Sequence, residues 1–146
     1  NMILSGRKIN DGMSAFVVEK FLNKLSPTID QNLNAKILIL GLAFKEDCPD
    51  IRNTKVIDIV NKLKTFNKNI CIVDPYADIE NTMYEYNLRI RNSIPEKMKF
   101  DGIIIALGHK EFQNFEINFW ESIMKSDCVL FDVKSIIPNE LSPIRL

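Results

Sequence analysis

A short apolar run that passes directly into a long polar loop is the feature that most constrains the fold of this chain. Residues 37–40 read ILIL, and Gly41 ends the run. Such a run of β-branched and leucine residues is typical of a strand buried on both faces of a parallel sheet. The loop that follows is rich in charge and leads to a helical pattern that we expect to begin near Asn53. Ligands bind outside the carboxyl ends of strands in such sheets, so this loop is where we look for function.

The rest of the chain alternates apolar runs with helical stripes. Further strands are expected at residues 70–73, 102–107 and 128–131, with a weak one at 88–90. Helices are expected at residues 56–63, 79–85 and 115–123. Alternation of this kind favours βαβ units, which predicts a Rossmann-like three-layer α/β sandwich with a mainly parallel sheet of about five strands. The tail, which contains Pro138 and Pro143, is expected to be irregular.

A helix is also expected before the sheet. Within residues 6–25, apolar side chains recur at three- and four-residue steps and share one face: Met13, Phe16, Val17, Phe21 and Leu25. Asp11 is a suitable N-cap, and Pro27 ends the pattern. Because residues 26–34 are polar, we predict a linking helix and linker at 1–34 and a separate domain at 35–146. The chain also opens as if cut from something longer.

Length, charge and cysteine usage narrow the function classes. The 146 residues suffice for one domain with a core, and 19 basic residues balance 19 acidic ones. No global field attracts nucleic acid or an anionic membrane, so neither partner is expected. Three scattered cysteines argue against a disulfide framework or a zinc site and suit a reducing cytoplasm. No apolar run reaches membrane-spanning length. A soluble cytoplasmic domain is expected.

The turn after the first strand argues against a dinucleotide site. Residues 41–45 hold one glycine where a phosphate cradle has three. Lys45 offers a point charge for a phosphate or sugar oxygen instead, although a solvated surface lysine is equally compatible with the pattern. Lys134 follows the last predicted strand, so a pocket with two cations is expected if the strand order is the usual one. Arg52 either reaches a ligand or pairs with Asp47 or Asp50.

The remaining candidate residues indicate a particular function less specifically. His109, the only histidine, either caps the helix after it or acts in catalysis, and no Ser-His-Asp spacing accompanies it. Cys48 has no partner histidine or cysteine nearby in sequence, so we interpret it as structural. Trp120 is expected in the core rather than on a base-stacking surface.

Residues 41–53, GLAFKEDCPDIRN, resemble the signature loop of the C-terminal domain of the UDP-glucose/GDP-mannose dehydrogenase family. Three further segments agree in the same order: GRKIND at 6–11, ALGHKEF at 106–112 and FDVK at 131–134. The resemblance covers essentially the whole chain. The loop sequence CPDIRN, together with the segment HKEF, is most similar to members acting on UDP-N-acetylhexosamines in capsule or O-antigen synthesis.

The resemblance implies that the intact protein oxidises C6 of a UDP-hexose to the uronic acid with NAD. Phe44 and Lys45 then contact the nucleotide sugar, and Arg52 reaches the NAD site. Lys134 stands where many members have an arginine near the substrate. The family's catalytic cysteine lies in a Gly-Gly-x-Cys type motif before the GRKIND helix, and NAD is bound mainly by an N-terminal domain; this chain contains neither that motif nor the NAD glycine fingerprint. No catalytic residue is therefore assigned here, the chain alone is expected to be inactive, and the full-length enzyme is expected to be a homodimer.

Two other functions remain compatible with the pattern. The chain could be a stand-alone regulatory α/β domain that binds a protein, although a receiver would carry acids directly after its first strand. It could equally be a nucleotide-binding module without catalysis.

Overall fold

The computed structural model describes residues 11–25, 34–67 and 69–146. Its centre is one sheet of five parallel strands in the order β2-β1-β3-β4-β5. Their bounds are β1 Ile37–Leu40, β2 Ile70–Val73, β3 Phe100–Ile105, β4 Met124–Asp132 and β5 Ile144–Arg145. From β1 the chain passes to β2 on one side and then to β3 on the other. The order therefore reverses beside β1, the position at which open α/β sheets bind ligands.

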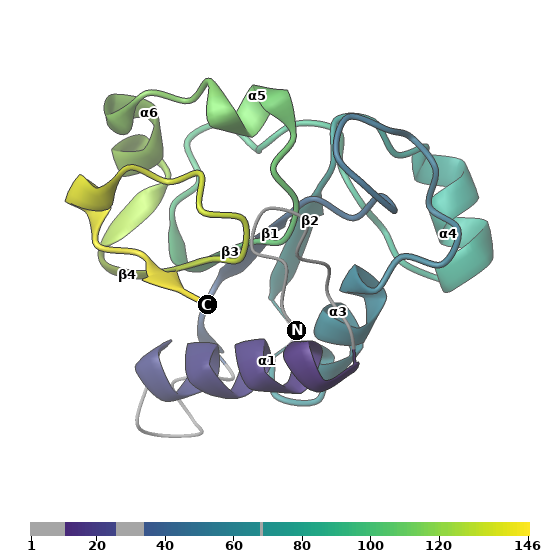
Figure 1. The fold of residues 1–146 in the computed structure, drawn as a ribbon, viewed down its shortest axis with the longest axis horizontal. Coiled ribbons are helices and arrows are strands. Elements are labelled where there is room, and N and C mark those ends of the chain that lie inside the picture. Colours follow the sequence, from purple (N-terminus) through teal and green to yellow (C-terminus); the bar gives the residue numbers. More distant parts are fainter. Residues whose placement is uncertain (1–10, 26–33, 68) are drawn as a thin grey trace.

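Helices cover both faces of the sheet, which completes three layers and confirms the predicted Rossmann-like fold (Figure 1). The helices are α1 Asp11–Leu25, α3 Val56–Lys64, α4 Ile79–Tyr86, α5 Lys110–Gln113 and α6 Ile117–Ser122, with a 3-10 turn at Asn139–Leu141. In β1 the side chains alternate between the two faces. Ile37 and Ile39 pack with α1 and α3, whereas Leu38 and Leu40 pack with the α5–α6 side. All four are fully buried, as a central parallel strand requires.

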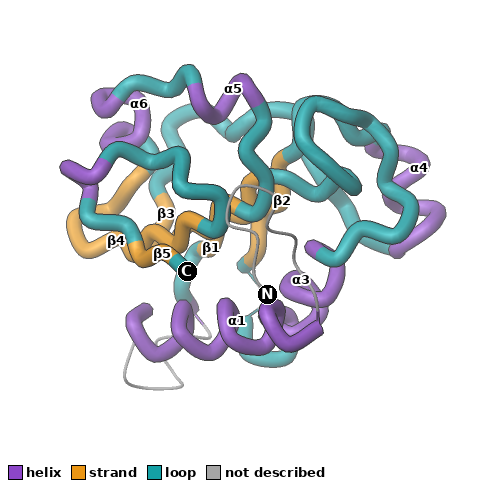
Figure 2. Tube along the Cα trace, in the orientation of Figure 1, coloured by secondary structure: helices purple, strands orange, loops and turns teal. Residues whose placement is uncertain are grey.

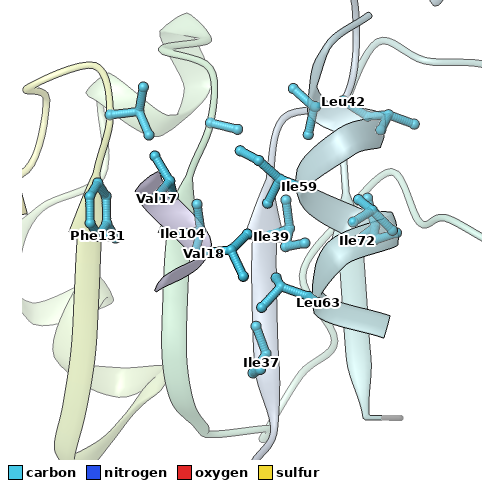
Figure 3. Packing of buried hydrophobic residues seen from close by; sticks show 14 of the residues in the cluster. Val17, Val18, Ile37, Ile39, Leu42, Ile59, Leu63, Ile72, Ile104 and Phe131 are labelled. Carbon is cyan, nitrogen blue, oxygen red and sulfur yellow. The ribbon is translucent and has the colours of Figure 1, made fainter. Parts of the chain in front are cut away.

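Helix α1 contributes to this core. Val17 and Phe21 have no exposed surface, and Figure 3 shows Val17 and Val18 beside Ile104 and Ile39 of the sheet. Phe16, which periodicity groups with the inward residues, is 44% exposed. The division of the chain at residue 34 stays a prediction.

Several element boundaries differ from expectation. Helix α3 begins at Val56 rather than near Asn53. The stripe at 115–123 contains only α6, and α5 is a separate short helix before it, closed by the bond from the Asn114 N–H to the Lys110 carbonyl. The weak strand predicted at 88–90 is wrong: its apolar residues are buried, but only Arg91 bridges to β2, at Val73.

The fifth strand comes from the tail instead. Ile144 and Arg145 pair with the end of β4, and the Arg145 guanidinium lies 3.5 Å from the Asp132 carboxylate. An irregular tail was therefore the wrong expectation for these residues. Two prolines before the strand concealed it, since proline usually marks a loop or an edge.

No helix in the described part of the chain is both long and apolar enough to cross a membrane. Loop segments, drawn in teal in Figure 2, make up much of the upper side of the molecule.

Candidate functional site

The polar loop after β1 starts from a carboxylate that lies at the end of the neighbouring strand. Asp74 follows β2 and is fully buried. Its Oδ2 accepts hydrogen bonds from the backbone N–H groups of Leu42 (2.7 Å) and Ala43 (2.8 Å). Its Oδ1 accepts from the N–H groups of Tyr76 (2.8 Å) and Ala77 (3.1 Å). One side chain thus orients the backbone after two strands, which fixes the direction in which the loop leaves the sheet.

His109 connects the same carboxylate to the middle of the loop. Its Nε2 lies 3.0 Å from Asp74 Oδ2, and its Nδ1 accepts the backbone N–H of Asp47 at 2.9 Å. Because Nδ1 is an acceptor here, the proton lies on Nε2 and is donated to Asp74. The side chain makes no capping bond to α5. His109 occupies the N-cap position of α5, as one of the two expectations had it, but its side chain does not act as the cap.

The hydrogen bonds also set the ionisation of Asp74. Burial alone would raise its pKa, but the bonds from His109, Leu42 and Ala43 outweigh this effect and hold the pKa below its ordinary value of 3.8. The side chain is therefore a carboxylate near neutral pH. Its charge is balanced by donors rather than by a cation.

Two acids of the loop attach it to the turn between β3 and α5. Glu46 Oε2 accepts the Gly108 N–H at 3.1 Å and lies 3.4 Å from Lys134 Nζ. Asp47 Oδ1 accepts the Lys110 N–H at 2.8 Å. Partial burial raises the pKa of Glu46, but the Gly108 bond and the Lys134 charge more than offset this and bring it below its ordinary value. The acids of this loop therefore anchor it to the fold.

Gly41 makes room for this arrangement. Its φ of +99° is a conformation that side chains disfavour. A Cβ there would lie 2.6 Å from Leu107 Cβ and 2.9 Å from Leu107 N. The single glycine of the turn thus allows β1 and the end of β3 to approach each other.

The anchored loop forms one wall of a small pocket at the carboxyl edge of the sheet. The pocket has a volume of about 80 Å³ and is lined by residues 43–46, 53–56 and 106–107 and by Lys134. Phe44 and Lys45 are exposed on the loop, and Lys134 faces them from the end of β4. The structure therefore brings Phe44, Lys45 and Lys134 together, and Lys55 lines the same pocket as a third lysine. The volume is well below the roughly 300–1,000 Å³ of pockets that enclose a small molecule.

Arg52 does not line the pocket. Its Nε and Nη2 each lie 3.0 Å from an oxygen of Asp50, a two-point pairing in which the arginine side chain is 82% exposed. The bond from Arg52 lowers the pKa of Asp50 to about 2, with a smaller contribution from Lys45. Of the partners considered from sequence, Asp50 is the one found.

Sequence reasoning missed the residues that organise the pocket. Neither Asp74 nor Glu46 was among the candidate residues. An acid directly after a buried strand at a carboxyl edge is the signal that was available. Trp120 is fully buried, as expected, and Cys48 is half-buried on the loop. Within the described ranges no group of histidine, cysteine and acidic side chains is arranged to hold a metal ion.

Comparison with known proteins identifies relatives that share the segments around the pocket. A family profile described as "UDP-glucose/GDP-mannose dehydrogenase family, UDP binding domain" matches residues 38–139, which include the loop, Asp74, His109 and Lys134. The chain is 38% identical over 145 residues to the UDP-N-acetyl-D-glucosamine 6-dehydrogenase of Pseudomonas aeruginosa, and 37% identical over 148 residues to that of Salmonella typhi.

These alignments cover 99% of this chain but 34% of each relative, so the chain spans about a third of their length. Among solved structures, the NDP-N-acetyl-D-galactosaminuronic acid dehydrogenase of Methanosarcina mazei superposes with a TM-score of 0.75 at 20% identity, over 93% of this chain and 28% of that one. That likeness supports the fold. The family segment at residues 6–10 lies outside the described residues.

Proposed function

The chain belongs to the UDP-glucose/GDP-mannose dehydrogenase family, and from this premise we propose that it is the substrate-binding, C-terminal part of an NAD-dependent nucleotide-sugar 6-dehydrogenase. The substrate we propose is a UDP-N-acetylhexosamine, oxidised at C6 to the uronic acid. The names of the two bacterial relatives support this substrate class. We further propose that residues 35–146 form the substrate domain after a linking helix, and that the intact enzyme is a cytoplasmic homodimer.

The pocket between Phe44, Lys45 and Lys134 is the observation that carries this proposal. An exposed aromatic ring suits stacking on a base or sugar, and the lysines suit the oxygens of a diphosphate. The small volume fits a half-site that a second domain completes. Arg52, exposed at the far end of the same loop, is the residue we assign to the NAD side of that closed cleft.

The turn after β1 does not fit an NAD site. A pyrophosphate cradle needs free backbone N–H groups after the first strand, whereas those of Leu42 and Ala43 are bonded to Asp74. We therefore assign NAD binding to an N-terminal domain of the intact protein. The chain alone should produce no NADH from a UDP-sugar and NAD, measured by absorbance.

Titration of the isotopically labelled chain with UDP and with GDP, followed by amide NMR shifts, tests the assignment at affinities down to the millimolar range. We expect UDP to bind more tightly than GDP and to shift the amides of Lys45 and Gly108. Lys45→Ala should weaken UDP binding about tenfold, as expected for a charge-assisted contact worth about 1.4 kcal/mol. Lys99→Ala, which removes an exposed lysine at the opposite edge of the sheet, serves as the matched control.

Preference for GDP would overturn the proposed substrate class. Equal effects of the two lysine substitutions would show that Lys45 acts only through the overall charge. The absence of any shift at the pocket with both nucleotides would remove ligand binding from this domain.

A further inference from the structure

We infer that Glu46 is a specificity residue that discriminates against nucleotides ending in a free phosphate and so favours nucleotide sugars. The inference rests on the proposed function, because it concerns which ligand the same pocket selects. It is carried by the position of Glu46, which lines the pocket together with Lys45, Lys55 and Lys134.

Glu46 is held in place independently of any ligand. Its Oε2 accepts the Gly108 N–H at 3.1 Å while lying 3.4 Å from Lys134 Nζ. The Lys134 side chain is only 18% exposed, so this pair is partly shielded from solvent. A carboxylate that is fixed by a backbone donor cannot turn away when an anion arrives. It stays at the pocket as a resident negative charge.

Lys134 is consequently a partly neutralised cation. An anion that approaches it must share the ammonium with Glu46 and lie near a like charge. Lys45 differs, since it is exposed on the loop and its charge helps to lower the pKa of Asp50. The pocket therefore combines two exposed lysines, Lys45 and Lys55, with a site at Lys134 that tolerates little additional negative charge.

Because of this resident negative charge, the pocket should distinguish UDP from a UDP-sugar by the charge on the diphosphate. In a UDP-sugar both phosphates are esterified on two sides, so each carries one charge. In free UDP the terminal phosphate has a further ionisation with a pKa of about 6, which adds a charge at neutral pH. A resident carboxylate repels the trianion more than the dianion. Repulsion by Glu46 therefore weakens the binding of UDP more than it weakens the binding of the UDP-sugar.

Glu46→Gln tests the inference with little change of shape, because the glutamine oxygen still accepts the Gly108 N–H. At pH 7.5 we expect the variant to tighten UDP about fivefold more than it tightens UDP-N-acetylglucosamine, the order of a partly screened charge interaction. Lys134→Met, which leaves Glu46 without its cation, should change the ratio of the two dissociation constants in the opposite direction. Glu111→Gln removes a nearby acid that does not line the pocket and should leave the ratio unchanged.

Measurement at pH 5.0 supplies an internal check. The terminal phosphate of UDP then loses its extra charge, whereas Glu46 stays ionised because its pKa lies below the ordinary value of 4.5. The effect of Glu46→Gln on the ratio should shrink accordingly. An unchanged ratio in Glu46→Gln at pH 7.5, with both ligands still binding, would overturn the inference and leave the proposed function standing. If neither ligand shifts the pocket amides of the unmodified chain, both fall.

Discussion

At the scale of single residues, Asp74 is the side chain on which the candidate site depends most. It accepts four backbone N–H groups and the His109 imidazole while fully buried. In Asp74→Asn, one acceptor oxygen becomes a donor, and the N–H groups it served lose their partner in the interior. We expect the free energy of unfolding at pH 7 to fall by about 3 kcal/mol, measured by urea denaturation. Asp127→Asn, an exposed acid on β4, should change it by no more than about 0.5 kcal/mol.

At the scale of elements, the contact between α1 and β3 is the one that a single methyl group should disrupt. A Cβ on Gly102 would lie 2.4 Å from Phe21 Cζ and 3.1 Å from Leu25 Cδ1. The Phe21 ring is fully buried, so it cannot rotate into solvent. Gly102→Ala should therefore cost about 2 kcal/mol of stability through overpacking.

A double-mutant cycle checks that the cost arises between these two elements. Phe21→Leu shortens the side chain that the new methyl would meet, so the double variant should lose less stability than the two single variants summed. A coupling energy of about 1 kcal/mol is expected. Additive losses would show instead that Gly102→Ala perturbs β3 itself.

The elements also show what local sequence pattern predicts well. Strand β1, helix α3 and the buried Trp120 follow from apolar spacing alone. Strand β5 does not, since Ile144 and Arg145 are a strand only by virtue of the partner that β4 provides. Residues 88–90 are the opposite case. Their apolar side chains are buried and so resemble a strand in sequence, but no neighbouring strand pairs with them continuously.

At the scale of the whole molecule, the acids of the site edge should set the pH dependence of stability. Glu46 and Asp74 both have pKa values below their ordinary values of 4.5 and 3.8. A depressed pKa means that the folded state binds protons less readily than the unfolded chain. The stabilisation is therefore complete above pH 4.5 and is lost as the pH falls through the lower, folded-state values.

Thermal unfolding followed by circular dichroism between pH 7 and pH 2.5 measures this dependence. We expect a nearly level midpoint temperature down to about pH 5 and a fall below it. In the Glu46→Gln variant the fall should be shallower, because one of the groups no longer titrates. A midpoint that rises on acidification would contradict the assignment of these acids as stabilising carboxylates.

The candidate site was predictable in part. Lys45 and Lys134 could be placed at one edge because both follow strands, and parallel strands end on the same side. The connections that fix them could not, because Asp74 and Leu42 are 32 residues apart and Asp47 and His109 are 62 apart. A periodic pattern carries no information on which distant N–H a carboxylate will accept.

The shared acceptor at Asp74 has a consequence for the order of folding. The segments after β1, β2 and β3 meet at one carboxylate, so none of them reaches its final path until all three strands are aligned in register. Closing such distant contacts is slow compared with forming helices. We therefore expect helical turns and the first strand pairs to form before the pocket, which needs all three strands in place.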